Sequence, residues 1–352
     1  MIQNIFILGE GKVGQTLIRQ ITDNDIPELG IHENPTVIRG TANSKEFTID
    51  GQKIPYQNLK EIFLILSKLG CEGDVIFVDV TSGKDELRDF HLELINKTRY
   101  KIVTANKNPI SLYNYDTYFT LTQDPTRYLY SATAMAGLGA VPWIQERAEI
   151  GDRVLEMTAS LSGTLGFLTD QLSQGIRLSA AIRVAIQNGY TEPDFRDDLN
   201  GLDFTRKLVI LGREARIPVE ISDIQLTRFL PDQYFKIPDP EDCLKAIEQN
   251  YDELITSRYR AAQAAGKTLK YLGHLKTDGS KTQLKIGFRE VPLESAFGRL
   301  KGTNNRLEVV TQIYTAEKPY LLEGPGAGLE ITASVIRRDL LRMQPRVNRR
   351  RA

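Results

Sequence analysis

The residues best suited to chemistry lie in an acidic loop and in the helix predicted to follow it. The loop begins at Gly189 and carries Glu192, and the helix carries Asp203 and Lys207. Because Asp203 and Lys207 are four residues apart, they share one face of the helix. Two carboxylates and an ammonium in one place could hold a small zwitterion and protonate an atom beside it. The simpler alternative is a helix start with one surface ion pair.

A second pattern, at the start of the chain, is typical of a dinucleotide-binding turn. A short apolar run at residues 5–8 leads into the Gly-x-Gly-x-x-Gly sequence of residues 9–14, and a helical pattern follows. Such a turn lets backbone approach a pyrophosphate and directs the N-terminus of the helix at the anion. The alternative is a glycine-rich turn in a fold that binds no nucleotide. The residues predicted to meet the cofactor here are Gly9, Gly11, Lys12, Val13 and Gly14.

The next predicted strand, at residues 36–40, bears on the choice between NAD and NADP. An NAD site commonly has an acid near the end of this strand, for the ribose hydroxyls. This strand instead carries Arg39, with Ser44 and Lys45 shortly after it. A guanidinium cannot accept a hydrogen bond from a hydroxyl, but it pairs well with a 2′-phosphate. The sequence therefore predicts NADP, bound through Arg39; the alternatives are NAD and a merely solvated Arg39.

The elements that would position these residues alternate along the first third of the chain. Apolar strand patterns at residues 5–8, 37–38, 75–80 and 102–103 are separated by helical patterns. This alternation is typical of a Rossmann-type α/β fold with a doubly wound parallel sheet. Such sheets bind ligands at the carboxyl ends of their strands. Thr81 and Ser82 follow one of these strands and Lys107 follows the next, so all three are predicted at that edge.

Small residues at positions 134–142 predict a crossover into a second domain. A strand pattern at residues 154–161 precedes Ser162-Gly163-Thr164, a helix start whose N–H groups could bind a carboxylate. Asp278-Gly279 predicts a hairpin between residues 270–275 and 283–288, and further strand patterns lie near 307–313 and 320–322. We expect an α+β domain with a mainly antiparallel sheet. The predicted divisions are a dinucleotide-binding domain at residues 1–135, a substrate domain at 136–323, a C-terminal helix returning to the cofactor domain at 324–343, and a basic tail at 344–352.

The composition fits an enzyme of two domains acting on a small molecule. The 352 residues include 45 Lys+Arg and 45 Asp+Glu, so the zero net charge favours neither nucleic acid nor a membrane as partner. No apolar stretch has the length of a membrane helix, and the first residues fit a strand rather than a signal peptide. Cys71 and Cys243 fit free thiols of a reducing compartment, which predicts a cytoplasmic location. His32, His91 and His274 lack metal-binding spacing.

With these residues in view, the chain resembles homoserine dehydrogenase over nearly its whole length. The resemblance rests on residues 189–207, on the Val-Thr-Ala-Asn-Lys run at 103–107, on Ser162-Gly163-Thr164 and on the Gly-Pro-Gly-Ala-Gly run at 324–328. It implies reversible, NAD(P)-linked interconversion of L-aspartate 4-semialdehyde and L-homoserine, in the branch toward threonine, isoleucine and methionine. It also implies a homodimer with the sheet of the second domain at the interface.

The resemblance further implies roles for the candidate residues. Lys207 would be catalytic, stabilising negative charge that develops on the substrate oxygen and relaying a proton. Lys107 would lie at the nicotinamide end and could share that role, so which lysine donates the proton stays open. The substrate would be bound by Glu192, Asp203, Thr164 and Asp198. Further cofactor contacts would come from Thr81, Gly326 and Gly328, beside the Ser82 predicted above.

Two positions depart from the family pattern. Residues 131–134 contain no acid, where the family generally carries a Glu that helps hold a monovalent cation, so a cation site near Ala134 stays open. Phe195 stands where these loops commonly have Pro. The alternatives are therefore a related dehydrogenase acting on another amino-acid aldehyde or alcohol, and a non-catalytic NADP-binding sensor. With no kinase or amino-acid-sensing segment in the sequence, we expect no feedback by threonine through such a domain.

Overall fold

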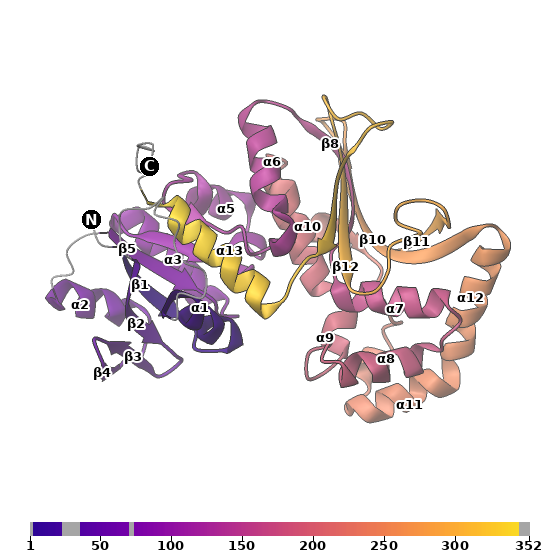
Figure 1. The fold of residues 1–352 in the computed structure, drawn as a ribbon, viewed down its shortest axis with the longest axis horizontal. Helices are drawn as coiled ribbons and strands as arrows, with labels where there is room; N and C mark the ends of the chain where they lie inside the picture. The colour runs from indigo at the N-terminus through magenta and orange to yellow at the C-terminus, as the bar shows by residue number, and fades with distance from the viewer. Residues whose placement is uncertain (1–2, 23–35, 70–73, 345–352) are drawn as a thin grey trace, which may run out of the picture. The chain divides into compact units, whose positions relative to one another are not determined.

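The computed structural model describes residues 3–22, 36–69 and 74–344, and the chain forms two compact units (Figure 1). The first unit comprises residues 1–141 and 327–352, and the second comprises residues 142–326. The divisions between the units therefore fall after residues 141 and 326, whereas the sequence predicted them after residues 135 and 323. His32, Cys71 and the predicted basic tail beyond Gln344 lie outside the described residues.

The first unit contains a seven-stranded sheet in the order β4-β3-β2-β1-β5-β6-β7. Its strands are β1 (Gln3–Leu8), β2 (Thr36–Ala42), β3 (Glu46–Ile49), β4 (Gln52–Pro55), β5 (Asp74–Asp79), β6 (Lys101–Thr104) and β7 (Tyr128–Leu129). Strand β1 pairs in parallel with β2 on one side and with β5 on the other, and β6 and β7 extend the parallel part. The predicted doubly wound parallel sheet is confirmed.

The antiparallel hairpin of β3 and β4 is absent from the sequence predictions. Its turn is Asp50-Gly51, with φ of 46° at Asp50 and 80° at Gly51. A two-residue hairpin turn needs positive φ at both central positions, and Asp-Gly is among the sequences that supply it most readily. The same dipeptide signal that predicted the hairpin of the second unit was therefore present here as well.

The central strands β1 and β5 are buried on both faces. The helices of this unit are α1 (Lys12–Thr22), α2 (Lys60–Leu69), α3 (Asp85–Lys97), α4 (Asn108–Ser111), α5 (Tyr115–Thr122), the 3₁₀ turn η1 (Ala136–Leu138) and α13 (Leu329–Arg342). On one face, Phe77 of β5 packs 5.7 Å from Phe6 of β1 and 5.3 Å from Phe90 of α3, between ring centroids. Successive strand residues point to opposite faces of the sheet. Ile76 and Val78, which flank Phe77 in β5, therefore face the opposite side of the sheet and a second layer of helices.

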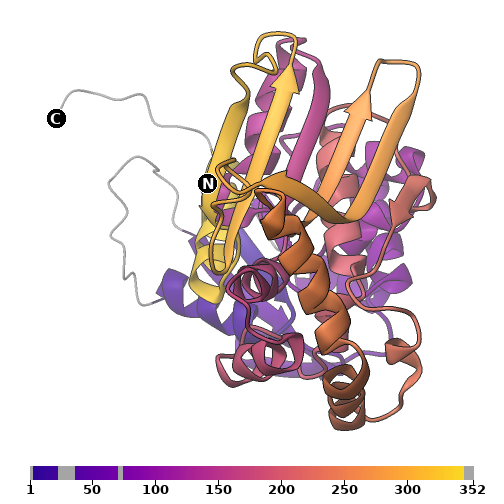
Figure 2. The same cartoon turned by 90° about the vertical axis from the view of Figure 1, so that its right-hand side faces the viewer.

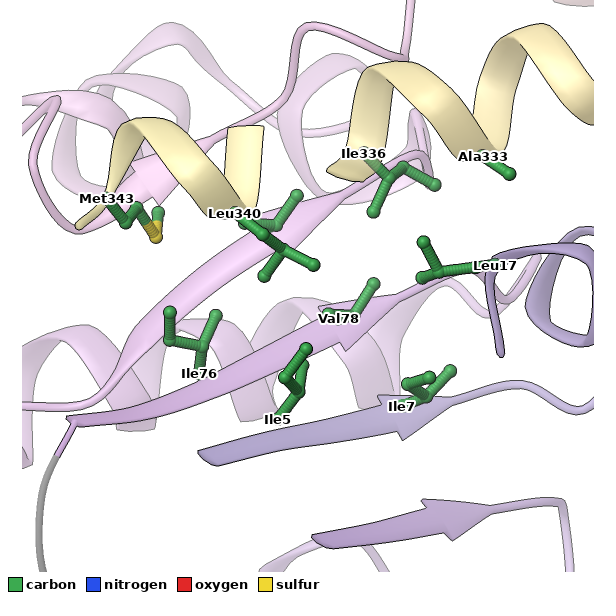
Figure 3. Close-up of a cluster of buried hydrophobic side chains, with 10 residues drawn as sticks. Ile5, Ile7, Leu17, Ile76, Val78, Ala333, Ile336, Leu340 and Met343 are labelled. Atoms are coloured by element: carbon green, nitrogen blue, oxygen red, sulfur yellow. The ribbon is translucent and has the colours of Figure 1, made fainter. Parts of the chain in front are cut away.

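That layer is formed by α1 and α13, a helix from the far end of the chain (Figure 3). The buried cluster between the helices and the strands includes Ile5, Ile7, Leu17, Ile76, Val78, Ala333, Ile336, Leu340 and Met343. Gln3 Nε2 donates to Leu340 O at 2.9 Å, and Gln20 Nε2 donates to Glu330 Oε2 at 2.9 Å. Apolar burial and polar bonds together make α13 part of the first unit.

The second unit contains a six-stranded sheet in the order β13-β12-β8-β10-β11-β9 (Figure 2). Its strands are β8 (Val154–Ser160), β9 (Ile224–Leu226), β10 (Lys267–Thr277), β11 (Thr282–Pro292), β12 (Asn304–Thr311) and β13 (Tyr320–Pro325). All neighbouring pairs are antiparallel except β9 with β11. The mainly antiparallel sheet is confirmed, and so is the hairpin across Asp278-Gly279, which joins β10 to β11.

In the second unit, strand β10 is covered by three helices, α7, α10 and α12. The helical elements are α6 (Ala140–Glu149, which begins at the unit boundary), α7 (Gly163–Ser173), α8 (Leu178–Gln187), α9 (Arg196–Leu199), α10 (Leu202–Glu214), η2 (Ile221–Asp223), η3 (Tyr234–Lys236), α11 (Pro240–Asn250) and α12 (Asp252–Ala264). A Cβ on Gly273 of β10 would lie 2.7 Å from Phe204 Cε1, so this glycine allows α10 its close approach. None of the helices in the described ranges is long and apolar enough to cross a membrane.

Candidate functional site

A cavity of about 490 Å³ opens in the first unit where β1, β2 and β5 end. Strand β1 lies between the other two, so the cavity sits where the strand order reverses, the usual ligand position in an open α/β sheet. Of the predicted cofactor residues, Gly9, Gly11 and Thr81 line it. The full lining is Leu8, Gly9, Glu10, Gly11, Ala42, Asn43, Ser44, Tyr56, Gln57, Leu59, Thr81, Gly83, Glu86 and Leu87.

The glycine turn fits the phosphates of a dinucleotide. Gly9 has φ of 108°, a conformation that favours glycine. A Cβ on Gly14 would lie 2.1 Å from Gly9 O, so α1 and the turn can pack only without a side chain there. A Cβ on Gly11 would meet no protein atom within 4 Å, which leaves the backbone open beside the first turn of α1. Backbone N–H groups at a helix start, with open space before them, suit an anion.

Substitutions at the two glycines separate packing from binding. We expect Gly14→Ala to destabilise the first unit by about 1–3 kcal/mol, because overpacking forces backbone shifts. We expect Gly11→Ala to leave the melting temperature unchanged and to raise the dissociation constant of NADH or NADPH at least tenfold, because its methyl group occupies the path of the pyrophosphate. Thermal unfolding and fluorescence titration measure the two effects. Unchanged cofactor binding by Gly11→Ala would contradict the placement of the pyrophosphate at this turn.

The structure does not bring Arg39 to the cavity. Strand β2 continues to Ala42, so the prediction that it ends at residue 40 is wrong. Arg39 lies within the strand, at an irregularity where Ile5 pairs with Ile38 and Phe6 pairs with Gly40. Its guanidinium lies 3.3 Å from the carboxylate of Asp50, in the turn of the β3–β4 hairpin. Ala42, Asn43 and Ser44, at the end of β2, line the cavity, whereas Arg39 does not.

Sequence reasoning missed Glu10 and Asn43, which meet beside the cavity. Thr41 Oγ1 donates to Glu10 Oε1 at 2.6 Å, and Asn43 Nδ2 donates to Glu10 Oε2 at 2.9 Å. These hydrogen bonds lower the pKa of Glu10, so its carboxylate is charged at neutral pH. Asn43 Oδ1 accepts from the backbone N–H groups of Lys45 and Glu46, which holds the turn after β2. The sequence feature that could have identified this site is Glu10, an acid inside the Gly-x-Gly-x-x-Gly motif.

The loops after β5 and β6 are tied together by side-chain hydrogen bonds. Asn106 Nδ2 donates to Asp79 Oδ2 at 3.0 Å and to Gly83 O at 3.0 Å. Asn108 Nδ2 donates to the carbonyl of Ser82 at 2.9 Å, so Ser82 meets this network through its backbone and does not line the cavity. Lys107 lies between the two asparagines, directly before α4. Its backbone is thereby held against the loop that carries Thr81.

A buried aspartate and a buried histidine lie side by side beneath these loops. Asp79 Oδ2 lies 3.3 Å from His91 Nε2, and His91 Nδ1 lies 2.9 Å from the hydroxyl of Tyr128. Thr81 donates to Asp79 Oδ1 from its N–H at 2.9 Å and from its Oγ1 at 2.7 Å. Burial alone would raise the pKa of Asp79, but His91 and the bonds from Thr81 lower it overall. The carboxylate therefore remains ionised and orients Thr81 toward the cavity.

In the second unit, Lys207 is held on two sides. Its Nζ lies 2.9 Å from Asp203 Oδ2 and donates to Leu161 O at 2.9 Å. The prediction that Asp203 and Lys207 share one helix face is confirmed on α10. The Lys207 side chain is 15% exposed and that of Asp203 is 43% exposed, so the ammonium is largely covered while its partner faces solvent. A covered, oriented ammonium is suited to bind a developing oxyanion.

The remaining substrate candidates gather around Asp198. Its Oδ2 accepts from the N–H of Glu192 at 2.8 Å, and Thr164 Oγ1 donates to its Oδ1 at 3.2 Å and to Tyr190 O at 2.5 Å. Burial raises the pKa of Asp198, and the nearby carboxylates of Glu192 and Asp203 raise it further. Ser162 begins α7 as predicted, accepting from Leu165 N at 3.2 Å. The structure thus brings Thr164, Glu192, Asp198, Asp203 and Lys207 into one group.

Other predicted cofactor residues do not line the cavity. Lys12 and Val13 form the first turn of α1. Gly326 belongs to the second unit, where a Cβ would lie 2.2 Å from Asn305 Oδ1, and Gly328 belongs to the first unit, directly before α13. Within the ranges that the structure describes, no group of three or more His, Cys, Asp or Glu side chains could hold a metal ion.

Curated proteins similar to this chain include enzymes with a fused kinase. A bifunctional aspartokinase/homoserine dehydrogenase from Haemophilus influenzae is 30% identical over 97% of this chain and 43% of its own length. A homoserine dehydrogenase from Saccharomyces cerevisiae is 29% identical over 78% of this chain and 76% of its own length. The chain thus spans about two fifths of the length of the bifunctional relatives that it matches.

Solved structures share the fold over nearly the whole chain. A protein of unknown function from Candida auris superposes with a TM-score of 0.86 and 25% identity, covering 97% of this chain and 98% of that one. A putative homoserine dehydrogenase from Archaeoglobus fulgidus gives a TM-score of 0.74 at 21% identity, covering 98% and 99% of the two chains. The family model for homoserine dehydrogenase matches residues 142–341. The chain belongs to the homoserine dehydrogenase family.

Proposed function

We propose that the protein interconverts L-aspartate 4-semialdehyde and L-homoserine with a nicotinamide dinucleotide. The observation that carries this proposal is the group around Lys207, which combines an oriented ammonium with the carboxylates of Glu192, Asp198 and Asp203. Such a group suits an amino-acid substrate, whose ammonium needs a carboxylate and whose reacting oxygen needs a donor. The name of the yeast relative describes this activity for that protein.

Each residue of the group has a proposed task. Glu192 binds the substrate ammonium, and Asp198 positions Glu192 by accepting its backbone N–H. Lys207, oriented by Asp203 and by Leu161 O, donates to the aldehyde oxygen and delivers the proton as the carbonyl is reduced to the alcohol. The nicotinamide, when bound, supplies the hydride. Lys107 is the second candidate for the proton donor, because the loop that carries it is held against the loop of Thr81.

The family uses NAD or NADP. The sequence favoured NADP through Arg39, which lies within β2 and outside the cavity lining, so that argument no longer supports NADP. We propose that the first unit, which includes α13, binds the dinucleotide and that the second unit binds the substrate, with the divisions after residues 141 and 326 in place of the predicted 135 and 323. We further propose a cytoplasmic homodimer that associates through the sheet of the second domain; a zero net charge is compatible with both.

The test follows the absorbance of the reduced nicotinamide with purified protein and L-homoserine. NAD⁺ and NADP⁺ are compared, each with sodium or potassium ions present and absent, and the reverse reaction is run with L-aspartate 4-semialdehyde. We expect turnover in both directions. Turnover of another amino-acid alcohol but not of homoserine would contradict the proposed substrate. Binding of the reduced cofactor without turnover of any amino-acid alcohol or aldehyde would contradict an enzymatic role.

A further inference from the structure

Glu10 places a carboxylate in the cavity at the end of β2, beside the glycine turn. It is the second residue of the glycine turn, and its carboxylate reaches the end of β2, where Thr41 and Asn43 donate to its two oxygens. Glu10, Asn43 and Ser44 all line the cavity. In this type of fold the end of β2, beside the glycine turn, is the place where the ribose hydroxyls are bound.

The chemistry of this carboxylate matches hydroxyl groups. Thr41 and Asn43 each occupy one acceptor site on a different oxygen, so each oxygen retains a further lone pair. The end of β2 supplies no acid of its own, because Ala42, Asn43 and Ser44 follow one another there. Asn43 already uses its side-chain oxygen for the turn. Glu10 therefore takes the place of the acid that usually comes from β2.

Among the described residues, Lys53 is close enough to lower the pKa of Glu10 slightly, but Lys53 and Arg39 pair with other carboxylates and stay outside the cavity lining. Arg39 lies 3.3 Å from Asp50, and Lys53 Nζ donates to Glu46 Oε2 at 3.1 Å. Neither cation lines the cavity, and Lys45 does not line it either. A 2′-phosphate carries roughly 1.5 to 2 negative charges near neutral pH. At the end of β2 it would lie beside the Glu10 carboxylate, and the two negative charges would repel each other.

We propose that Glu10 selects NAD over NADP, by accepting the ribose hydroxyls of NAD and repelling the 2′-phosphate of NADP. This selection rests on the proposed function in one respect, that the cavity holds a nicotinamide dinucleotide. It reverses the preference predicted from Arg39. The acid that determines cofactor choice comes from the glycine turn rather than from the end of the second strand.

The test measures binding, apart from turnover. Dissociation constants for NADH and NADPH are obtained by fluorescence titration, and those for 5′-ADP and adenosine 2′,5′-bisphosphate by calorimetry, so that the adenosine half is probed alone. We expect the wild-type protein to bind NADH at least tenfold more tightly than NADPH. Glu10→Gln should shift the ratio toward NADPH at least tenfold, because one charged acceptor is lost and the repulsion with it. The two adenosine probes should shift in the same direction.

Two variants separate charge from local structure. Thr41→Val removes a donor to Glu10 but keeps the charge, so the preference for NADH should remain. Arg39→Ala should leave the ratio unchanged, and melting temperatures show whether each variant folds. Equal or tighter binding of NADPH by the wild-type protein would overturn the inference, as would an unchanged ratio in a folded Glu10→Gln. Binding of neither dinucleotide overturns the proposed function as well, whereas the expected ratios without turnover of homoserine overturn the proposed function alone.

Discussion

If the proposed function holds, we expect Lys207→Ala to lower the turnover of L-homoserine by a factor on the order of 10² to 10³ and to leave the dissociation constant of NADH unchanged. Removal of one preorganised donor to a developing oxyanion commonly costs this much in rate. The Nζ of Lys207 is oriented by Asp203 Oδ2 and by Leu161 O, both at 2.9 Å, so its ammonium is preorganised as a donor. Cofactor binding survives because every lining residue of the cavity belongs to the first unit.

Steady-state kinetics and fluorescence titration measure this result, and two variants serve as comparisons. Asp203→Asn keeps the shape of the partner but removes its charge, so we expect a smaller loss of kcat than in Lys207→Ala. Lys107→Ala tests the other candidate donor. Near-wild-type turnover by a folded Lys207→Ala would contradict the assignment, and a large loss in Lys107→Ala would then transfer the role to Lys107.

We expect Asp79→Ala to lower the free energy of unfolding by about 3–5 kcal/mol, because three donors lose a buried, charged acceptor. The substitution leaves His91 buried without its carboxylate, and it removes the acceptor for the N–H and Oγ1 of Thr81 and for Asn106 Nδ2. Unsatisfied buried donors add to the loss. Chemical denaturation measures the free energy of unfolding. If the alanine variant does not fold, Asp79→Asn, whose side chain has nearly the same volume as that of Asp79, is measured in its place.

The control is Asp89→Asn on α3 of the same unit. Asp89 pairs with Arg88 and its side chain is 53% exposed, so we expect a change below about 1 kcal/mol. An effect of Asp79→Ala no larger than that of the control would contradict a stabilising role for the buried pair.

The destabilisation should also depend on pH. The folded protein holds the pKa of Asp79 below its ordinary value, so the ionised carboxylate stabilises the fold above the unfolded-state pKa of about 3.9. That contribution is lost as the pH falls through the lower pKa of the folded state. The difference in stability between the wild-type protein and Asp79→Asn should therefore be largest near neutral pH and should shrink in acid.

The features that the sequence by itself determined depend on neighbours along the chain. The pairing of Asp203 with Lys207 needs only a helix and a spacing of four, and the β10–β11 hairpin needs only Asp278-Gly279 between two strand patterns. The glycine turn follows from the positions of three glycines between a strand and a helix. Such features could be predicted because hydrogen bonds within a helix or turn join residues that are close in sequence.

Only the tertiary structure decided which distant residues meet. The extent of β2 follows from its pairing with β1, and that pairing, rather than local propensity, keeps Arg39 within the strand and brings Asn43 to Glu10. The pair of Asp79 with His91 and the packing of α13 beside α1 likewise join segments that are remote along the chain. The physical reason is that strand register and burial are set by the sum of contacts across a sheet and its helices, which no short stretch of sequence contains.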